Sequence, residues 1–138
     1  MKPPRYLLRE YIVKRIFAFK PRGRLLEVGY GGGDMLLNFA EWGYQVSGYD
    51  FSESAKTCAS NLIGRYGVSG IELLEDIKSH VSYDFVVFFE VIGYWSDPVK
   101  QLREYAKLLT PRGKIVFSFT NIKSAGGAGK RTCHMRGM

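Results

Sequence analysis

The sequence has 138 residues and a formal net charge of +7, with 46% hydrophobic and 24% charged residues. This length suits a single domain, and the composition is that of an ordinary globular protein, which argues against a disordered or fibrous chain. The two cysteines, Cys58 and Cys133, have neither zinc-ligand spacing nor the pattern of a disulfide framework. We expect no metal site, no secretory leader and no transmembrane segment, and hence a cytoplasmic protein.

The positive charge gathers at the two ends of the chain. Residues 1–24 hold eight Lys and Arg against the single acid Glu10, and residues 123–138 hold four with no acid. Between them, 12 acidic residues outnumber 8 basic ones. A basic chain indicates nucleic acid when one folded face carries the charge. The sequence therefore gives no clear nucleic-acid partner, although a basic protein that binds nucleic acid or a membrane surface stays open as an alternative.

The first 23 residues predict an N-terminal amphipathic helix. Apolar residues recur at positions 8, 12, 16 and 19, and basic residues fall at 5, 9, 14, 15 and 20. Lys20-Pro21-Arg22-Gly23 ends the helix. We interpret it as a cap over a ligand site formed further along the chain, and the alternative is peripheral contact with an anionic membrane surface.

An apolar strand candidate at 24–28 runs into a glycine-rich loop and then into a helix over 35–42. Glycine stands at every second position of this loop, at Gly29, Gly31 and Gly33. Glycine permits strained backbone dihedrals and close approach of a ligand. A dinucleotide-binding GxGxxG motif would require glycine at position 34, which is Asp34. The loop therefore favours a different cofactor.

The rest of the chain alternates strands and helices. Apolar runs predict strands at 44–49, 71–74, 85–89 and 114–119, with helices after Ser52 and over 99–109. This order predicts an α/β fold, a Rossmann-like doubly wound, mainly parallel sheet of about five strands with helices on both faces. The core domain is expected at 24–122. The glycine-rich, basic residues 123–138 show no periodicity and predict a disordered tail.

The residues that end the strands are the candidate ligand contacts, because ligands of such sheets bind outside the carboxyl ends of the strands. Asp50 ends the second strand, where its carboxylate can accept hydrogen bonds from two ribose hydroxyls, and Phe51 follows as a surface for adenine. The third strand is followed by Asp76, a partner for an adenine amino group, with the Ile77 amide beside it. Phe89 and Glu90 end the fourth strand, where backbone carbonyls can hold an ammonium group.

Residues 24–121 resemble the class I S-adenosylmethionine-dependent methyltransferases, in particular the bacterial small-molecule branch. The resemblance rests on the glycine loop and on four further segments: Gly48-Tyr49-Asp50-Phe51-Ser52, Tyr83-Asp84, Phe89-Glu90-Val91-Ile92 and Leu108-Leu109-Thr110-Pro111-Arg112-Gly113. It implies that the glycines and Asp50 bind S-adenosyl-L-methionine and that Asp76 and Ile77 hold the adenine. It also implies that Glu27 orders the loop near the methionine amine, and Tyr30, inside the loop, joins the expected cofactor contacts.

The resemblance predicts methyl transfer to a small-molecule or cell-envelope precursor acceptor. The same kind of binding site also holds decarboxylated S-adenosylmethionine in enzymes that transfer an aminopropyl group, so that cofactor stays an alternative. No catalytic base is named: His80 is expected in a surface loop, and Tyr94 is expected on the acceptor side. Relatives have Glu-His where this chain has Gly93-Tyr94.

The family's sheet has seven strands, and this chain looks shortened after Asn121. We expect the last two strands to be missing and the fifth strand to be an exposed edge. A non-catalytic remnant that binds cofactor therefore stays an alternative function.

Overall fold

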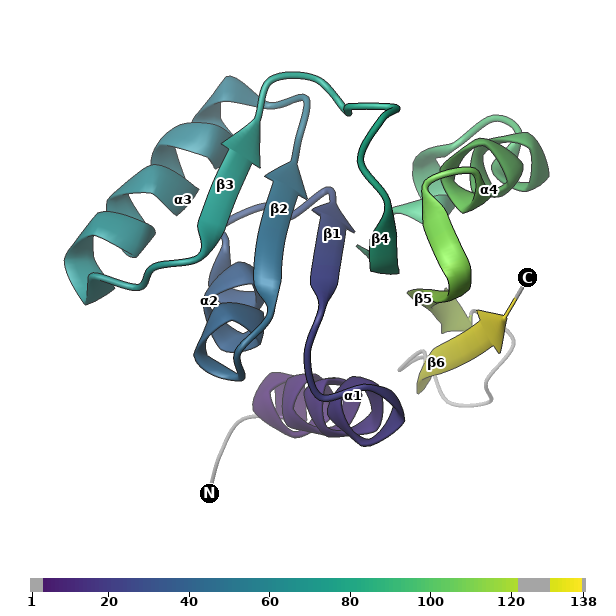
Figure 1. Cartoon of the computed structure of the whole chain (residues 1–138), viewed down its shortest axis with the longest axis horizontal. Helices are drawn as coiled ribbons and strands as arrows, with labels where there is room; N and C mark the ends of the chain where they lie inside the picture. Colours follow the sequence, from purple (N-terminus) through teal and green to yellow (C-terminus); the bar gives the residue numbers. More distant parts are fainter. Residues whose placement is uncertain (1–3, 122–129, 138) are drawn as a thin grey trace.

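A six-stranded sheet runs through the middle of the molecule, and the computed structural model describes residues 4–121 and 130–137 of the chain (Figure 1). The strands are β1 (Arg24–Val28), β2 (Gln45–Tyr49), β3 (Ile71–Leu74), β4 (Tyr83–Phe89), β5 (Leu109–Asn121) and β6 (Lys130–Gly137). They lie in the order β3-β2-β1-β4-β5-β6, and the first five are parallel. The predicted mainly parallel, doubly wound sheet is confirmed.

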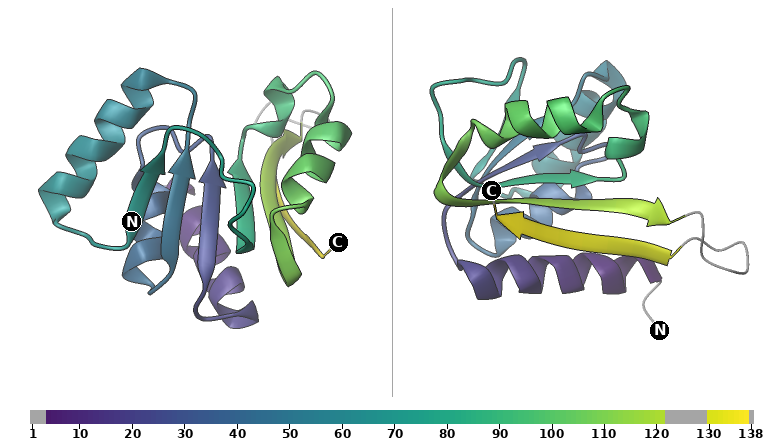
Figure 2. Two further views of the ribbon diagram at one scale, coloured as in Figure 1. Left: turned by 45° about the horizontal axis from the view of Figure 1, so that its top comes forward. Right: turned by 90° about the vertical axis from the view of Figure 1, so that its right-hand side faces the viewer.

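Helices cover both faces of the sheet. They are α1 (Pro4–Phe19), α2 (Asp34–Glu41), α3 (Glu53–Tyr66), the 3-10 turn η1 (Ile92–Tyr94) and α4 (Pro98–Ala106). One apolar core joins buried residues of α1, α2 and α3 to the sheet, and the other packs α4 against the opposite face. Figure 2 shows α1 and α4 on opposite sides of the strands. Helices on both faces are the reason that β4 is buried along most of its length.

The N-terminal helix forms as predicted and packs along the sheet. Ile12, Val13 and Ile16 of α1 are buried in the same core as Phe39 of α2 and Phe85 of β4. Their spacing places them on one stripe of the helix. The apolar periodicity therefore reports burial against this sheet.

The C-terminal segment differs from the prediction of a disordered tail over 123–138. Residues 130–137 form β6, which pairs antiparallel with β5 from Lys114↔Gly137 to Asn121↔Lys130. The prediction of β5 as an exposed edge is therefore wrong, and β6 is the edge. Composition missed this strand because an existing edge supplies backbone donors and acceptors for pairing, so an added strand needs little apolar periodicity. Residues 123–129 and 138 lie outside the described residues.

The strand order reverses between β1 and β4. The chain moves outward from β1 to β2 and β3, and then returns to the other side of β1 to form β4. Such a switch point opens a crevice outside the carboxyl ends of the two central strands. The loop after β1 and the residues that follow β4 therefore meet at this crevice.

The opposite, amino-terminal edge of the sheet is closed by Asp84 of β4. Its carboxylate accepts hydrogen bonds from the Lys20 ammonium at 2.6 Å, the Arg24 amide at 2.9 Å and the Thr110 hydroxyl at 3.3 Å. Partial burial acts to raise the pKa of Asp84, but these hydrogen bonds and the Lys20 charge outweigh it and lower the pKa below its ordinary value. Asp84 thus ties the end of α1, the start of β1 and the start of β5 together.

Candidate cofactor site

The glycine loop joins β1 to α2 in a conformation that suits glycine. Gly29, Gly31 and Gly33 have positive φ values of 74°, 54° and 90°. A Cβ on Gly29 would lie 2.5 Å from Val91 Cγ2, and a Cβ on Gly33 would lie 2.9 Å from Ala59 Cβ. A Cβ on Gly31 would meet no described atom within 4 Å. Packing thus fixes the two outer glycines, whereas the middle glycine borders open space.

Asp50 connects the loops that follow β1 and β2. Its Oδ2 accepts from the Gly31 amide at 3.0 Å, and its Oδ1 accepts from the Ser52 amide at 2.9 Å. Each carboxylate oxygen has two lone pairs, so both oxygens keep acceptor capacity for a ligand. Ser52 also caps α3 through its side chain, which accepts from the Ala55 amide. The carboxylate is therefore held at a fixed position beside the open middle of the glycine loop.

A cavity of about 540 Å³ lies at this point, and we call it the cofactor cavity. Of the residues predicted from the sequence, six line it: Gly29, Gly31, Asp50, Phe51, Phe89 and Glu90. The Phe51 side chain is 91% exposed, although it is a large aromatic ring. Among the described residues that line the cavity, two are acids and none is basic. A ligand that carries positive charge therefore suits this cavity.

Five of the predicted site residues do not line the cofactor cavity. Glu27 is 2% exposed inside β1. Gly33 is the N-cap residue of α2 and packs against Ala59 of α3. Tyr30 is buried in the core with α1 and α2, and burial, together with the Asp50 and Glu53 charges, raises the pKa of its phenol. Beyond β3, Asp76 is exposed and Ile77 packs against the core under α4. Their predicted ligand contacts stay predictions.

Sequence reasoning missed an aromatic wall of the cavity, made by Trp95 and Tyr105. The two rings stack with centroids 5.8 Å apart, and both meet Phe88 edge-on, at 5.1 and 4.9 Å. Burial raises the pKa of the Tyr105 phenol, and the nearby Tyr49 adds a smaller effect in the same direction. The sequence predicts a helix over 99–109, but helical spacing does not separate a cavity wall from ordinary core.

Glu90 has an unusual backbone conformation at the end of β4. It is the non-glycine residue with positive φ in the described chain, at 60°. Its amide donates to the Ser118 carbonyl at 3.1 Å and to the Ser118 hydroxyl at 3.2 Å. Ser118 is 2% exposed, so β5 holds this turn firmly. Backbone strain of this kind persists where surrounding structure enforces it, often at functional sites.

A second cavity of about 530 Å³ adjoins the first, and we call it the acceptor cavity. The two share Glu90, Tyr94 and Trp95, and the acceptor cavity adds Ile92, Gly93, Pro98 and Phe119. Tyr94 is 89% exposed on η1, where the sequence placed it on the acceptor side. His80 is exposed and lines neither cavity, as predicted.

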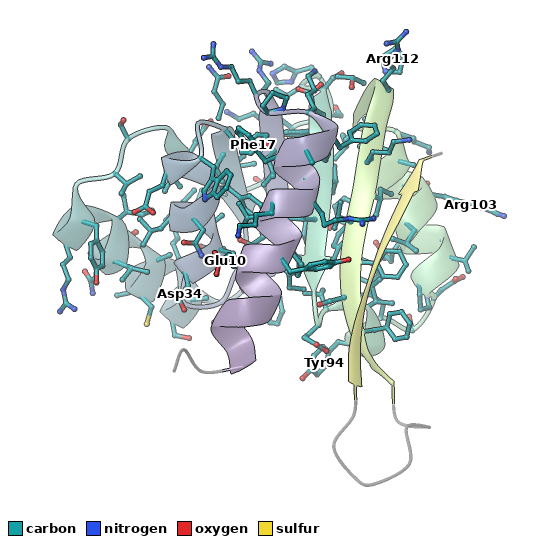
Figure 3. All side chains as sticks on the ribbon, turned by 90° about the horizontal axis from the view of Figure 1, so that it is seen from below. Glu10, Phe17, Asp34, Tyr94, Arg103 and Arg112 are labelled. Atoms are coloured by element: carbon teal, nitrogen blue, oxygen red, sulfur yellow. The ribbon has the colours of Figure 1, made fainter. Side chains whose placement is uncertain are left out.

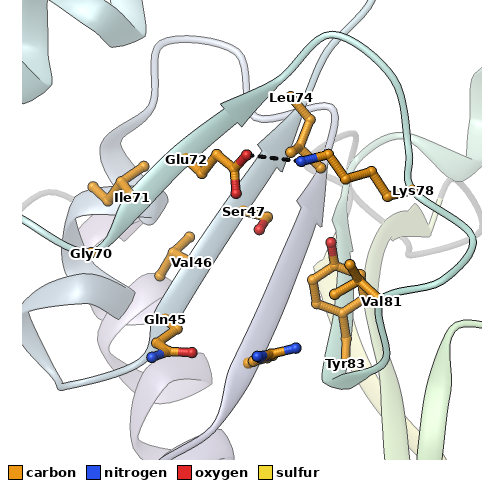
Figure 4. Close-up of a pocket in the computed structure, with 11 residues that line it drawn as sticks. Gln45, Val46, Ser47, Gly70, Ile71, Glu72, Leu74, Lys78, Val81 and Tyr83 are labelled. Atoms are coloured by element: carbon orange, nitrogen blue, oxygen red, sulfur yellow. Dashed lines mark hydrogen bonds and ion pairs between the residues drawn. The ribbon is translucent and has the colours of Figure 1, made fainter.

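A further hollow of about 440 Å³ lies away from the glycine loop (Figure 4). It is lined by the starts of β1 and β2, by β3 and by the segment leading to Tyr83, and an ion pair of 3.2 Å joins Lys78 to Glu72 across it. Among the described residues no group of three or more His, Cys, Asp or Glu could hold a metal ion. Within the same residues, no helix is long and apolar enough to cross a membrane.

Comparison with known proteins decides the family. The family model described as "Methyltransferase domain" matches residues 4–135, nearly the whole chain. The chain belongs to the class I S-adenosylmethionine-dependent methyltransferases. S-Adenosylmethionine is the cofactor of that family.

Curated relatives are similar over the same region. The chain is 38% identical over 104 residues to the ubiquinone biosynthesis O-methyltransferase of Idiomarina loihiensis, covering 71% of this chain and 42% of that protein. It is 35% identical over 103 residues to the protein of the same name from Nitrosospira multiformis, covering 70% and 43%. The chain thus spans less than half the length of these relatives.

Solved structures agree on the fold. PKMT2 from Rickettsia typhi, in complex with AdoHcy, is 28% identical with a TM-score of 0.63, covering 73% of this chain and 22% of that one. A putative sarcosine dimethylglycine methyltransferase from Galdieria sulphuraria has a TM-score of 0.74 at 17% identity, covering 81% and 45%. The second likeness concerns the fold alone.

Proposed function

We propose that this chain binds S-adenosylmethionine in the cofactor cavity and transfers its methyl group to an oxygen of a small aromatic acceptor. The observation that carries the proposal is the position of the Asp50 carboxylate. It accepts hydrogen bonds from the Gly31 and Ser52 amides and lies beside open space at the switch point. A carboxylate held there, with acceptor capacity left on both oxygens, suits a ribose diol.

The residues around Asp50 fit the remaining parts of this cofactor. The exposed Phe51 ring offers a flat surface for adenine, and Glu90 and Phe89 would hold the methionine end. Asp50 and Glu90 supply negative charge for a ligand with ammonium and sulfonium groups. The aromatic wall formed by Trp95 and Tyr105 adds π-faces, which attract cations.

When bound, S-adenosylmethionine supplies an electrophilic methyl group on a positively charged sulfur. The task of the chain is then to orient the acceptor and to exclude water, which contributes several kcal/mol to such reactions. Tyr94, Trp95 and Phe119 would hold a flat acceptor in the acceptor cavity. Glu90 lines both cavities, so its carboxylate is our candidate to accept the proton of an acceptor hydroxyl.

Two observations support an oxygen on an aromatic acceptor. The acceptor cavity has aromatic and apolar lining, and the relatives that are 35–38% identical bear the name ubiquinone biosynthesis O-methyltransferase. We therefore favour a small hydroxylated aromatic molecule over a cell-envelope precursor.

Calorimetric titration with S-adenosylhomocysteine tests the cofactor site. We expect micromolar binding, and a loss of at least about tenfold for Asp50→Ala, because a hydrogen bond to a charged group contributes about 1.5–3 kcal/mol. Glu104→Ala, which removes an exposed carboxylate on α4, is the matched control and should bind normally. A folded chain that does not bind S-adenosylhomocysteine would contradict the proposal.

The titration, combined with a methyl-transfer assay, separates the alternatives. Normal cofactor binding without turnover on a panel of catechols and phenols would favour a non-catalytic, cofactor-binding chain. A loss of affinity in Asp76→Ala would support a contact of Asp76 with the adenine, as the resemblance implies.

A further inference from the structure

The outward side of α1 forms a surface of aromatic and basic side chains, together with Trp42 just after α2. We call it the aromatic–basic face. Figure 3 views the molecule from this side, with α1 lying across the front of the sheet and Phe17 on its flank. Its members are Tyr11, Lys14, Arg15, Phe17, Phe19, Lys20, Arg22 and Trp42.

The exposed aromatic rings on this face are unusually concentrated. Eight large hydrophobic side chains are exposed in the described chain, and four of them belong to this face: Tyr11 at 52%, Phe19 at 50%, and Phe17 and Trp42 at 37% each. Phe17 meets Trp42 edge-on, with ring centroids 4.9 Å apart. Exposed aromatic rings gathered on one side of the molecule mark an interaction site more often than scattered residues do.

Cations lie among these rings. The Arg15 guanidinium lies 5.8 Å from the centre of the Tyr11 ring, and the Lys114 ammonium lies 5.0 Å from the Phe19 ring. Lys14 pairs with Glu10 at 3.1 Å, and Lys20 is engaged by Asp84, so acids of the same chain offset part of the charge. Arg15 and Arg22 add charge on the same exposed face.

We propose that the aromatic–basic face docks on an anionic lipid bilayer, with α1 parallel to the membrane plane. Exposed Trp, Tyr and Phe beside Lys and Arg is the composition that places a helix at the headgroup level. Stacking of bases on aromatic rings needs a groove that follows a nucleic-acid strand. The hollow of about 650 Å³ at this side reaches only Phe19 and Lys20 of the face, and Tyr11, Phe17 and Trp42 do not line it. A lipid surface accommodates a long convex helix without such shape complementarity.

Vesicle binding of the full chain tests this proposal, with Trp42 as the reporter. We expect co-sedimentation with phosphatidylglycerol–phosphatidylcholine vesicles and weak binding to phosphatidylcholine alone. Brominated lipid should quench the fluorescence of Trp42 on binding. The variant Trp42→Phe, which retains Trp95, should bind vesicles but lose this quenching, because Trp95 lies at the cofactor cavity.

A pair of double variants shows whether this face carries the binding. Lys14→Gln with Arg15→Gln should lower the partition coefficient by about 30-fold. Lys100→Gln with Arg103→Gln removes the same charge from exposed positions of α4, on the opposite side of the sheet (Figure 2), and should lower it much less. Circular dichroism establishes that both are folded.

Three outcomes would overturn the proposal: no anionic vesicle binding by the folded chain, equal losses in the two double variants, or binding to duplex DNA in place of vesicles. S-Adenosylhomocysteine titration of the same preparations keeps this test separate from the proposed enzymatic function, since vesicle binding does not involve the cofactor cavity.

Discussion

The amino-terminal and carboxyl-terminal ends of the parallel strands each hold an aspartate, and the two aspartates have opposite surroundings. At the amino-terminal edge, the carboxylate of Asp84 is surrounded by donors of its own chain, from Lys20, Arg24 and Thr110. At the carboxyl edge, the carboxylate of Asp50 accepts from two backbone amides and faces a cavity. One aspartate closes the fold, and the other remains available for a ligand.

This difference extends to the neighbouring residues. The carboxyl edge also holds the positive-φ glycines, the exposed Phe51 ring and the left-handed Glu90, whose backbone strain costs stability. Substitutions at the two edges should therefore separate binding from folding.

The glycine loop should give the largest effects. Gly29→Ala forces a Cβ against Val91 at positive φ, and we expect about 3 kcal/mol of lost stability together with lost cofactor binding. Gly31→Ala meets no neighbour, so we expect about 1 kcal/mol from backbone strain but a similar loss of binding. Urea unfolding and S-adenosylhomocysteine titration measure the two effects. Equal destabilisation by both variants would contradict a ligand-facing Gly31.

Asp84 should show the reverse pattern. Asp84→Asn removes the charge that Lys20 and the Arg24 amide stabilise, and we expect about 1–3 kcal/mol of lost stability with cofactor affinity unchanged. The lowered pKa of Asp84 also predicts a pH effect.

Because the folded pKa is lower than the unfolded one, its stabilisation is present above the ordinary value of 3.8 and disappears as the pH falls through the folded pKa. Unfolding free energy measured between pH 5 and pH 2 should therefore fall less in Asp84→Asn than in the unsubstituted chain. An unaltered slope would show that other carboxylates cause the acid sensitivity.

Phe51→Ala should have the smallest effect on the fold. Its ring is 91% exposed, so we expect a stability change within about 0.5 kcal/mol. If the ring lies against adenine, S-adenosylhomocysteine affinity should fall by about tenfold. Phe51→Tyr preserves a flat ring and should bind normally. Unchanged affinity in Phe51→Ala would place the adenine elsewhere in the cavity.

Much of the site could be predicted because strand ends carry positional information. Asp50, Phe89 and Glu90 are predictable from their places at the ends of apolar runs, because parallel strands bring those places to one edge. The glycine spacing located the loop in the same way. These inferences needed local sequence and the topology of a doubly wound sheet.

Other parts depend on contacts that local sequence does not encode. Tyr30 lies in the glycine loop, yet its ring turns into the core. Trp95 and Tyr105 come from separate elements and form a wall through stacking. The pairing of β6 depends on backbone groups that β5 presents, which leave no signal in residues 130–137.

The strand order also sets a sequence of events during synthesis of the chain. The Gly31–Asp50 hydrogen bond joins residues 19 apart, and β1, β2 and β3 precede β4 in the chain and pair as neighbours in the sheet. The Asp84 contact with Arg24 spans 60 residues. We therefore expect the glycine loop and Asp50 to come together early in folding, and Phe89, Glu90 and Asp84 to join them only after the slower, long-range pairing of β4 beside β1.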